Sequence, residues 1–76
     1  MPSTQVALQE FGRRVRERRL ELALSQEELA ERADLHRTYI SSLEQGRRNV
    51  ALRNIIRLAE ALDLDPGQLV GGLSSD

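Results

Sequence analysis

Residues 25–49, SQEELAERADLHRTYISSLEQGRRN, constrain the fold of this chain more than any other segment, because they predict two short helices joined by a tight turn. Ser25 and Glu28 have the S-x-x-E spacing of a capping box, in which each side chain binds the backbone N–H of the other residue, so a helix begins here. A second helix follows a break and ends near Gly46, which adopts the left-handed conformation of a helix end without strain. The segment therefore predicts a helix-turn-helix over about residues 25–46.

The second of these helices can bury only one narrow edge. Its aliphatic residues are Ile40 and Leu43, three positions apart. The side chains left to point elsewhere are those of Arg37, Thr38, Tyr39, Ser41, Ser42 and Gln45. Most of them can hydrogen-bond the edges of bases. A helix-turn-helix that inserts its second helix in the major groove of double-stranded DNA is the direct interpretation.

Residues 8–64 strongly resemble the phage-repressor family of regulators, which are Cro-like, or XRE-type, helix-turn-helix proteins. The resemblance is carried by LSQEELAERA at residues 24–33, by LRNIIRLAEAL at residues 52–62, and by a framework of four residues between them. These are Ile40, Leu43, Glu44 and Gly46. HRTYISSLEQGRRN, at residues 36–49, is most similar to the controller proteins of restriction–modification systems. The resemblance implies a small homodimeric transcription regulator, repressor or activator, that binds a palindromic operator upstream of its own gene.

Composition bounds the class of protein. The 76 residues make one domain, residues 1–76, with a small core that gains from dimerisation. There is no Cys and a single His, which excludes a structural zinc site, a disulfide scaffold and cysteine catalysis, so we expect no enzyme, metal or cofactor. No apolar run approaches the roughly 18 residues of a membrane span, and the N-terminus lacks the order of a secretory signal. We expect a cytoplasmic protein that does not associate with a membrane and binds no small-molecule ligand.

The net charge of −1 is unevenly distributed. Residues 36–57 contain five Arg and one Glu, a net +4, and residues 1–22 carry a net +2. Residues 23–35 carry −3 and residues 58–76 carry −4. This asymmetry favours one basic face that binds nucleic acid. A solvated mixed surface explains the pattern equally well, so charge alone leaves both interpretations open.

Hydrophobic periodicity predicts an all-α fold, a compact five-helix bundle that contains the helix-turn-helix. The family resemblance implies that this bundle is similar to the DNA-binding domain of lambda repressor. A first helix spans about residues 6–22, and Gly12 within it marks the close approach of another helix. A fourth helix spans about residues 52–62. Its expected core face consists of Leu52, Ile55, Ala59 and Leu62. Asp65–Pro66 suits the N-cap and first position of a short fifth helix over about residues 65–72.

The fifth helix carries more apolar side chains than a one-turn helix needs for its own packing. With one residue on the flank of the fourth helix, they predict an exposed patch that serves as a homodimer interface. The residues of this expected interface are Ile56, Leu69, Val70 and Leu73. Closure of the core is the alternative explanation. A two-fold dimer presents two DNA-reading helices about one DNA turn apart, which implies a roughly palindromic site.

The expected DNA contacts form two sets. The residues expected to read bases are Arg37, Thr38, Ser41 and Ser42. The residues expected to hold the DNA backbone or sense its shape are Gln26, Tyr39, Gln45, Arg47, Arg48 and Asn49. The resemblance implies a phosphate contact for Gln26 and a place for Tyr39 beside deformed DNA. The alternatives are an exposed polar helix face for the first set and packing under the preceding helix for Tyr39.

Two further pairs of residues have expected roles. The resemblance pairs Arg19 with Glu44 as a structural salt bridge, which fits the high cost of a lone buried carboxylate. Glu27 and Glu31 lie on the exposed face of the first helix of the pair. In regulators that also activate, the resemblance implies that acidic residues here contact the sigma subunit of RNA polymerase. Dipole matching and solvation are the ordinary explanation for both glutamates.

The sequence departs from the family pattern in three places. Ala23 replaces the usual Gly. Asp34 stands where Gly or Asn is common, and His36 stands where a Ser or Thr cap is common. Ala51 replaces a Ser or Thr cap, at a cost of about 1 kcal/mol. These differences bear on the helix boundaries and leave the fold intact.

A second function is kept as an alternative, the antitoxin of a toxin–antitoxin pair that also represses its own operon. The short tail of the chain offers little surface for a toxin, which counts against it.

Overall fold

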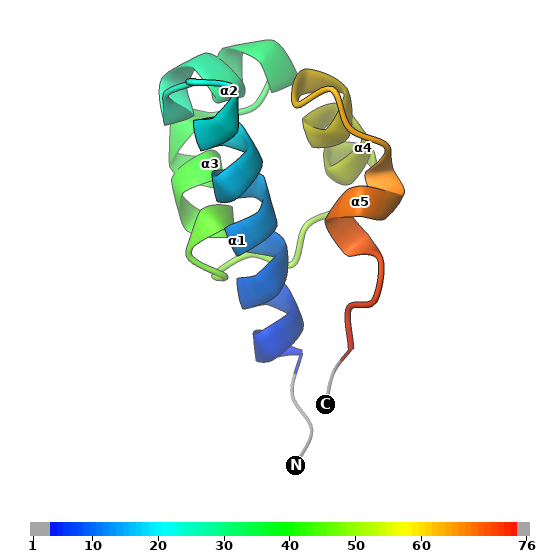
Figure 1. Cartoon of the computed structure of the whole chain (residues 1–76). Helices are drawn as coiled ribbons and strands as arrows, with labels where there is room; N and C mark the ends of the chain where they lie inside the picture. The colour runs from blue at the N-terminus through cyan, green and yellow to red at the C-terminus, as the bar shows by residue number, and fades with distance from the viewer. Residues whose placement is uncertain (1–3, 75–76) are drawn as a thin grey trace.

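The computed structural model describes residues 4–74 and places five α-helices within them (Figure 1). They are α1 (Gln5–Glu21), α2 (Gln26–Ala33), α3 (Arg37–Glu44), α4 (Leu52–Ala61) and α5 (Pro66–Val70). No strand occurs in this part of the chain. α1 packs against both α3 and α5, while α2 contacts α3 and α4 and so joins the two sides of the bundle. The predicted all-α fold of five helices is confirmed.

The capping box predicted at the start of α2 is present. The Glu28 N–H donates to the Ser25 hydroxyl at 3.0 Å, and the Ser25 N–H donates to the Glu28 carboxylate at 2.9 Å. These bonds satisfy two of the N–H groups that a helix start leaves without a partner. The pKa of Glu28 is lowered, and the largest cause is the hydrogen bond that its carboxylate accepts from the backbone N–H of Ser25. The first helix of the helix-turn-helix is thus fixed at its N-terminus by local chemistry.

Gly12 brings α1 close to the end of α3, as the sequence predicts. A Cβ atom built on Gly12 would lie 2.7 Å from the carbonyl oxygen of Glu44, and closer still to that of Leu43. Both atoms belong to backbone, which cannot move aside as the end of a flexible side chain can. The residue must therefore be Gly if α1 and α3 are to pack at this distance.

The expected core face of α4 is wrong at its start. Leu52 is 71% exposed, whereas Leu58, absent from the expected face, is fully buried. Because Leu52 is the first residue of α4, its side chain lies beyond the surface that packs against the core. The packed face instead has the i, i+3, i+4, i+7 spacing of a broad helical stripe. It consists of Ile55, Leu58, Ala59 and Leu62.

The placement of Leu69 in an exposed dimer patch is also wrong. Its side chain is fully buried and belongs to the main core cluster. α5 has five residues, too few to hold a helix in water by themselves, so it needs a buried anchor to stay on the bundle. For this residue, closure of the core is the correct explanation.

Three turns that end helices use non-glycine residues with left-handed backbone. Ala23, after α1, has φ 57° and Asp63, after α4, has φ 56°. Asp34 ends α2 in the same conformation, as its tolerance of this geometry predicts. Ala23 therefore carries the strain expected from the loss of the usual Gly. Ala51 caps α4 without a side-chain hydrogen bond, which also agrees with the expectation.

Candidate nucleic-acid interface

α3 is held by one edge and presents the rest of its surface outward. Ile40 and Leu43 are fully buried, and they pack α3 against α1 and α2. Arg37 and Thr38 are exposed at its N-terminal end. Ser41 and Ser42 follow one turn later and are half-buried. The four residues expected to read bases thus lie on a single short helix, with the two exposed side chains at its leading end.

A buried ion pair fixes the other end of α3. The Arg19 guanidinium donates to both carboxylate oxygens of Glu44, at 2.7 and 3.0 Å, and to the carbonyl oxygen of Leu24 at 2.8 Å. The side chains of Arg19 and Glu44 are 9% and 3% exposed. These bonds to Glu44 raise the pKa of Arg19 against the opposing effect of burial. The expected salt bridge is therefore formed, and it links α1 to α3 by two parallel hydrogen bonds.

Gln26 is joined to this ion pair. Its side-chain amide donates to the Glu44 carboxylate at 3.2 Å, from the first residue of α2. Glu44 thereby receives hydrogen bonds from both α1 and α2. The Gln26 side chain is held near the N-terminus of α2, where the helix dipole favours an anion.

The side chain of Tyr39 extends from α3 toward α4. Its half-buried ring packs against the core, and its hydroxyl accepts a hydrogen bond from the Asn54 amide at 3.3 Å. The guanidinium of Arg48 lies 5.8 Å from the ring centre, within the range of a cation–π contact. Sequence reasoning did not find Asn54, because nothing in the local pattern of α4 indicates a partner on α3.

The segment that follows α3 is basic and exposed. Arg47, Arg48 and Asn49 are all exposed, and the Arg47 N–H donates to the Ser42 carbonyl at 3.0 Å. Gln45 instead turns back along α3, and its amide donates to the carbonyl and hydroxyl oxygens of Ser41, both at 3.2 Å. The structure therefore brings three of the expected backbone-contacting residues together, just beyond the C-terminal end of α3.

The acidic residues of α2 lie on a separate surface. Glu27 and Glu31 are both exposed, one helical turn apart. Neither makes an ion pair within the described part of the chain. Their carboxylates are available to solvent or to a partner.

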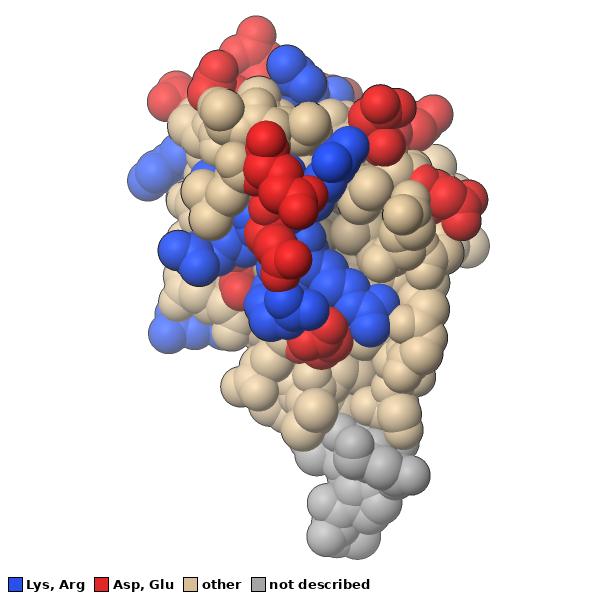
Figure 2. Space-filling view, in the orientation of Figure 1, with Lys and Arg blue, Asp and Glu red and all other residues tan. Residues whose placement is uncertain are grey.

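Apolar side chains are exposed on α4 and on α5. Ile56 and Val70 are 41% and 37% exposed, and Leu73 is half-buried. Val70 and Leu73 line an apolar hollow of about 140 Å³ between α1, α4 and α5. On the face shown in Figure 2, the described part of this end of the molecule, next to the grey residues, shows no acidic or basic side chain.

Over residues 4–74, no group of three or more His, Asp or Glu side chains is placed to hold a metal ion. None of the helices described is long and apolar enough to cross a membrane.

Known proteins share both the sequence pattern and the arrangement of these helices. The family model described as helix-turn-helix matches residues 15–69. The control protein C.BamHI of Bacillus amyloliquefaciens is 51% identical over 61 residues, which cover 79% of this chain and 75% of that protein. The crystal structure of the restriction–modification controller protein C.AhdI from Aeromonas hydrophila superimposes with a TM-score of 0.80 at 50% identity, covering 82% of this chain and 94% of that one.

A further solved structure contains DNA. It is the restriction–modification controller protein C.Esp1396I as a tetramer in complex with its natural 35 base-pair operator. That chain is 30% identical and superimposes with a TM-score of 0.74, with 78% of each chain covered.

Proposed function

The chain belongs to the helix-turn-helix family, and we propose that it is the sequence-specific transcription regulator of a restriction–modification system. The observation that carries this proposal is the setting of α3. One edge of the helix is fully buried and its end is fixed by a buried ion pair, while Arg37 and Thr38 are exposed at the leading end. A rigidly held helix with a polar outer face is what insertion in the major groove requires.

We assign base contacts to Arg37, Thr38, Ser41 and Ser42. An arginine at the N-terminal end of the helix can bond O6 and N7 of one guanine together, and a threonine methyl can meet the methyl group of thymine. The two serines lie one turn further along and supply shorter hydrogen-bonding groups. Because Gln45 already donates to Ser41, the Ser41 hydroxyl keeps its own hydrogen for a base acceptor.

Backbone contacts are assigned to residues on both sides of α3. Gln26 is held by Glu44 at the start of α2, with a second amide hydrogen left for a phosphate. Arg47, Arg48 and Asn49 are exposed beyond the other end of α3, and Gln45 lies beside them. Tyr39 is assigned to the sugar–phosphate edge, where it senses the shape of the DNA. These contacts position the protein and make its affinity depend on salt.

The proposed active form is a homodimer. Its interface is assigned to the exposed Ile56 and Val70 and to Leu73, and Val70 and Leu73 line an apolar hollow between α1, α4 and α5. A second copy of the chain is the proposed occupant, since a two-fold axis there would set two copies of α3 against a palindromic operator. The tetramer of C.Esp1396I on its operator supports assembly of this general kind.

A gel shift tests sequence-specific binding. The purified chain is incubated with DNA from just upstream of its own gene, with random duplex as competitor. Discrete bands that resist the competitor are expected. Arg37→Ala should lower the preference for the operator by about 1–3 kcal/mol, whereas Arg47→Ala should weaken binding to both DNAs alike. Equal competition by random DNA, or an equal loss of preference in both variants, would contradict the proposal.

Activation of transcription is a separate part of the proposal. The exposed pair Glu27 and Glu31 is assigned to a contact with the sigma subunit of RNA polymerase. In an in vitro transcription assay, the double variant Glu27→Gln and Glu31→Gln should lose activation and keep its affinity for the operator. A parallel loss of both activities would contradict the assignment.

A further inference from the structure

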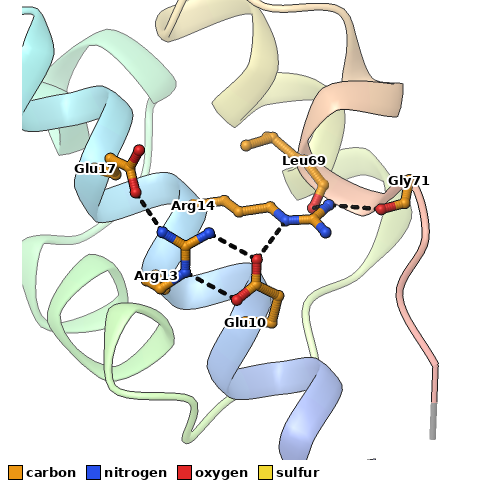
Figure 3. Close-up of polar contacts among 6 residues, drawn as sticks. All are labelled: Glu10, Arg13, Arg14, Glu17, Leu69 and Gly71. Atoms are coloured by element: carbon orange, nitrogen blue, oxygen red, sulfur yellow. Dashed lines mark hydrogen bonds and ion pairs between the residues drawn. The ribbon is translucent and has the colours of Figure 1, made fainter.

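Glu10, Arg14 and Arg18 are spaced four residues apart in α1, so they lie along one side of that helix. Figure 3 shows Arg14 extending from α1 to the backbone of α5, with Glu10 bonded to it on the α1 side. The Arg14 guanidinium donates to the carbonyl oxygens of Leu69 at 3.2 Å and Gly71 at 2.8 Å. These two carbonyls precede and follow Val70 in the chain. Arg14 therefore hydrogen-bonds the backbone on both sides of Val70, whose apolar side chain is exposed on α5.

The third residue of this row, Arg18, makes the equivalent contact with α4. Its guanidinium donates to the carbonyl oxygen of Leu62, the C-cap of that helix, at 3.0 Å. The last carbonyls of a helix have no partner within the helix, and the helix dipole places partial negative charge on them. Two arginines of α1 thus bind the C-terminal ends of two successive helices.

α5 depends on contacts of this kind. Its N-terminal end has a capping box, in which the Gly67 N–H donates to the Asp65 carboxylate and the Asp65 N–H donates to Gln68, both at 3.1 Å. Its middle is anchored by the buried side chain of Leu69. At its C-terminal end, Gly71 and Gly72 are exposed and have no side chain to pack. The bonds from Arg14 join the backbone of this end of α5 to α1, next to the apolar hollow that Val70 and Leu73 line together with residues of α1.

Glu10 holds Arg14 in position. Its carboxylate accepts from the Nε atom of Arg14 at 2.9 Å and from two nitrogens of Arg13, both at 2.8 Å. These bonds, with those of Arg13 the largest cause, lower the pKa of Glu10 to about 2. Arg13 also pairs with Glu17, so the charges form a continuous row, and Figure 2 shows acidic and basic groups lying side by side on this face.

We propose that Arg14, supported by Glu10 and Arg18, is a positioning residue for dimerisation. By fixing the carbonyls on both sides of Val70, it sets the position and orientation of α5 on the bundle, and so how Val70 and Leu73 contact the second copy of the chain. The proposal rests on the homodimer proposed above. It predicts that a charged residue outside the apolar interface controls the strength of the dimer, and that it acts through α5 alone.

The test compares two variants of α1 that lose the same charge. Arg14→Met keeps an apolar stem and removes every donor, and Arg16→Met makes the same change at an exposed position of the same helix. Sedimentation equilibrium gives the dimer dissociation constant of each. Arg14→Met should raise it about tenfold or more, since bonds from a charged donor are lost, and Arg16→Met should change it by less than about threefold.

Hydrogen exchange separates positioning from general stability. In dilute solution, where the chain is monomeric, Arg14→Met should speed exchange of the amides of residues 66–73 and leave those of α2 and α3 unchanged. A uniform increase in all helices would reduce Arg14 to a structural residue and overturn the proposal. So would a wild-type dissociation constant in a folded Arg14→Met.

A milder variant guards against misfolding. Arg14→Lys keeps the charge and can reach one carbonyl where Arg14 reaches two, so an intermediate dissociation constant is expected, with faster exchange only in α5. Wild-type values for both would overturn the proposal. If the wild-type chain itself stays monomeric at all concentrations, the homodimer fails. If it dimerises and Arg14→Met dimerises equally well, only the role of Arg14 fails.

Discussion

The two sides of the bundle are held to α1 by different kinds of bond. α3 is fixed by the ion pair of Arg19 and Glu44, whose side chains are almost completely buried and bonded in two places. α5 is fixed by Arg14, which remains partly exposed and binds backbone carbonyls. The first arrangement is costly to disrupt, and the second is adjustable. The difference suits the proposed function, in which α3 must be rigid to read DNA and the strength of dimerisation can be tuned.

The largest expected effect comes from breaking the buried pair. Arg19→Met leaves the Glu44 carboxylate buried without its partner, so it should reduce the free energy of unfolding by about 3–5 kcal/mol. The matched change on the same helix is Arg13→Met, which breaks only exposed ion pairs and should destabilise the protein far less. Urea denaturation of both variants measures the difference. Equal losses of unfolding free energy would mean that burying the ion pair of Arg19 and Glu44 does not raise the cost of breaking it.

A somewhat smaller effect is expected where α1 meets α3. Gly12→Ala would place a methyl group against the backbone carbonyls of Leu43 and Glu44. The two helices must then move apart, which should cost about 1–3 kcal/mol. In an exposed helix the same change would stabilise by up to about 1 kcal/mol, so the sign of the effect is itself a test. Thermal unfolding of Gly12→Ala measures the sign, and a raised midpoint would show that the close approach is not needed.

The left-handed turns that end α1 and α4 provide a matched pair on the two sides of the molecule. Ala23 has a strained, left-handed φ of 57°. Ala23→Gly removes this strain and should stabilise the protein by about 1 kcal/mol. Asp63→Gly, at φ 56°, should gain less, because Asp tolerates the left-handed region better than Ala does. Thermal midpoints of both variants rank the two sites. A larger gain at Asp63 would mean that the tolerance of Asp for this backbone conformation does not decide the order.

The smallest expected effect is a dependence on pH through Glu10. Its pKa is lowered from 4.5 to about 2 in the folded chain, so the folded state favours the ionised carboxylate. The resulting stabilisation is complete above the unfolded value and is lost as the pH falls from about 4.5 to about 2. The difference in unfolding free energy between wild type and Glu10→Gln should therefore shrink over this range. Urea titrations at several pH values measure it, and a constant difference would exclude Glu10 as the cause.

The parts of the structure that sequence reasoning predicted depend on residues close together in the chain. The capping box of Ser25 and Glu28 spans three residues, and Gly46 has the left-handed φ of 74° that a helix end requires. The narrow buried edge of α3 follows from the spacing of its two aliphatic residues. Such features are decided by bonds and periodicity within one or two turns, so they can be derived without knowledge of the fold.

The features that were missed depend on elements far apart in the sequence. Leu52 and Leu58 fit helical periodicity equally well, and only the end of the packed surface decides that Leu58 is the buried one. The bond between Asn54 and Tyr39 spans 15 residues, and those from Arg14 to α5 span 55 and 57. Arg19 and Glu44, 25 residues apart, were paired through resemblance to a family and not by any local pattern.

The sequence by itself therefore determined where the helices of the helix-turn-helix begin and end and which side chains of α3 face outward. The tertiary structure alone decided that Leu69 belongs to the core, and that arginines of α1 bind the carbonyl ends of α4 and α5. The physical reason is that a carbonyl at a helix end has the same chemistry in every sequence. Which cation reaches it is set by how the helices pack.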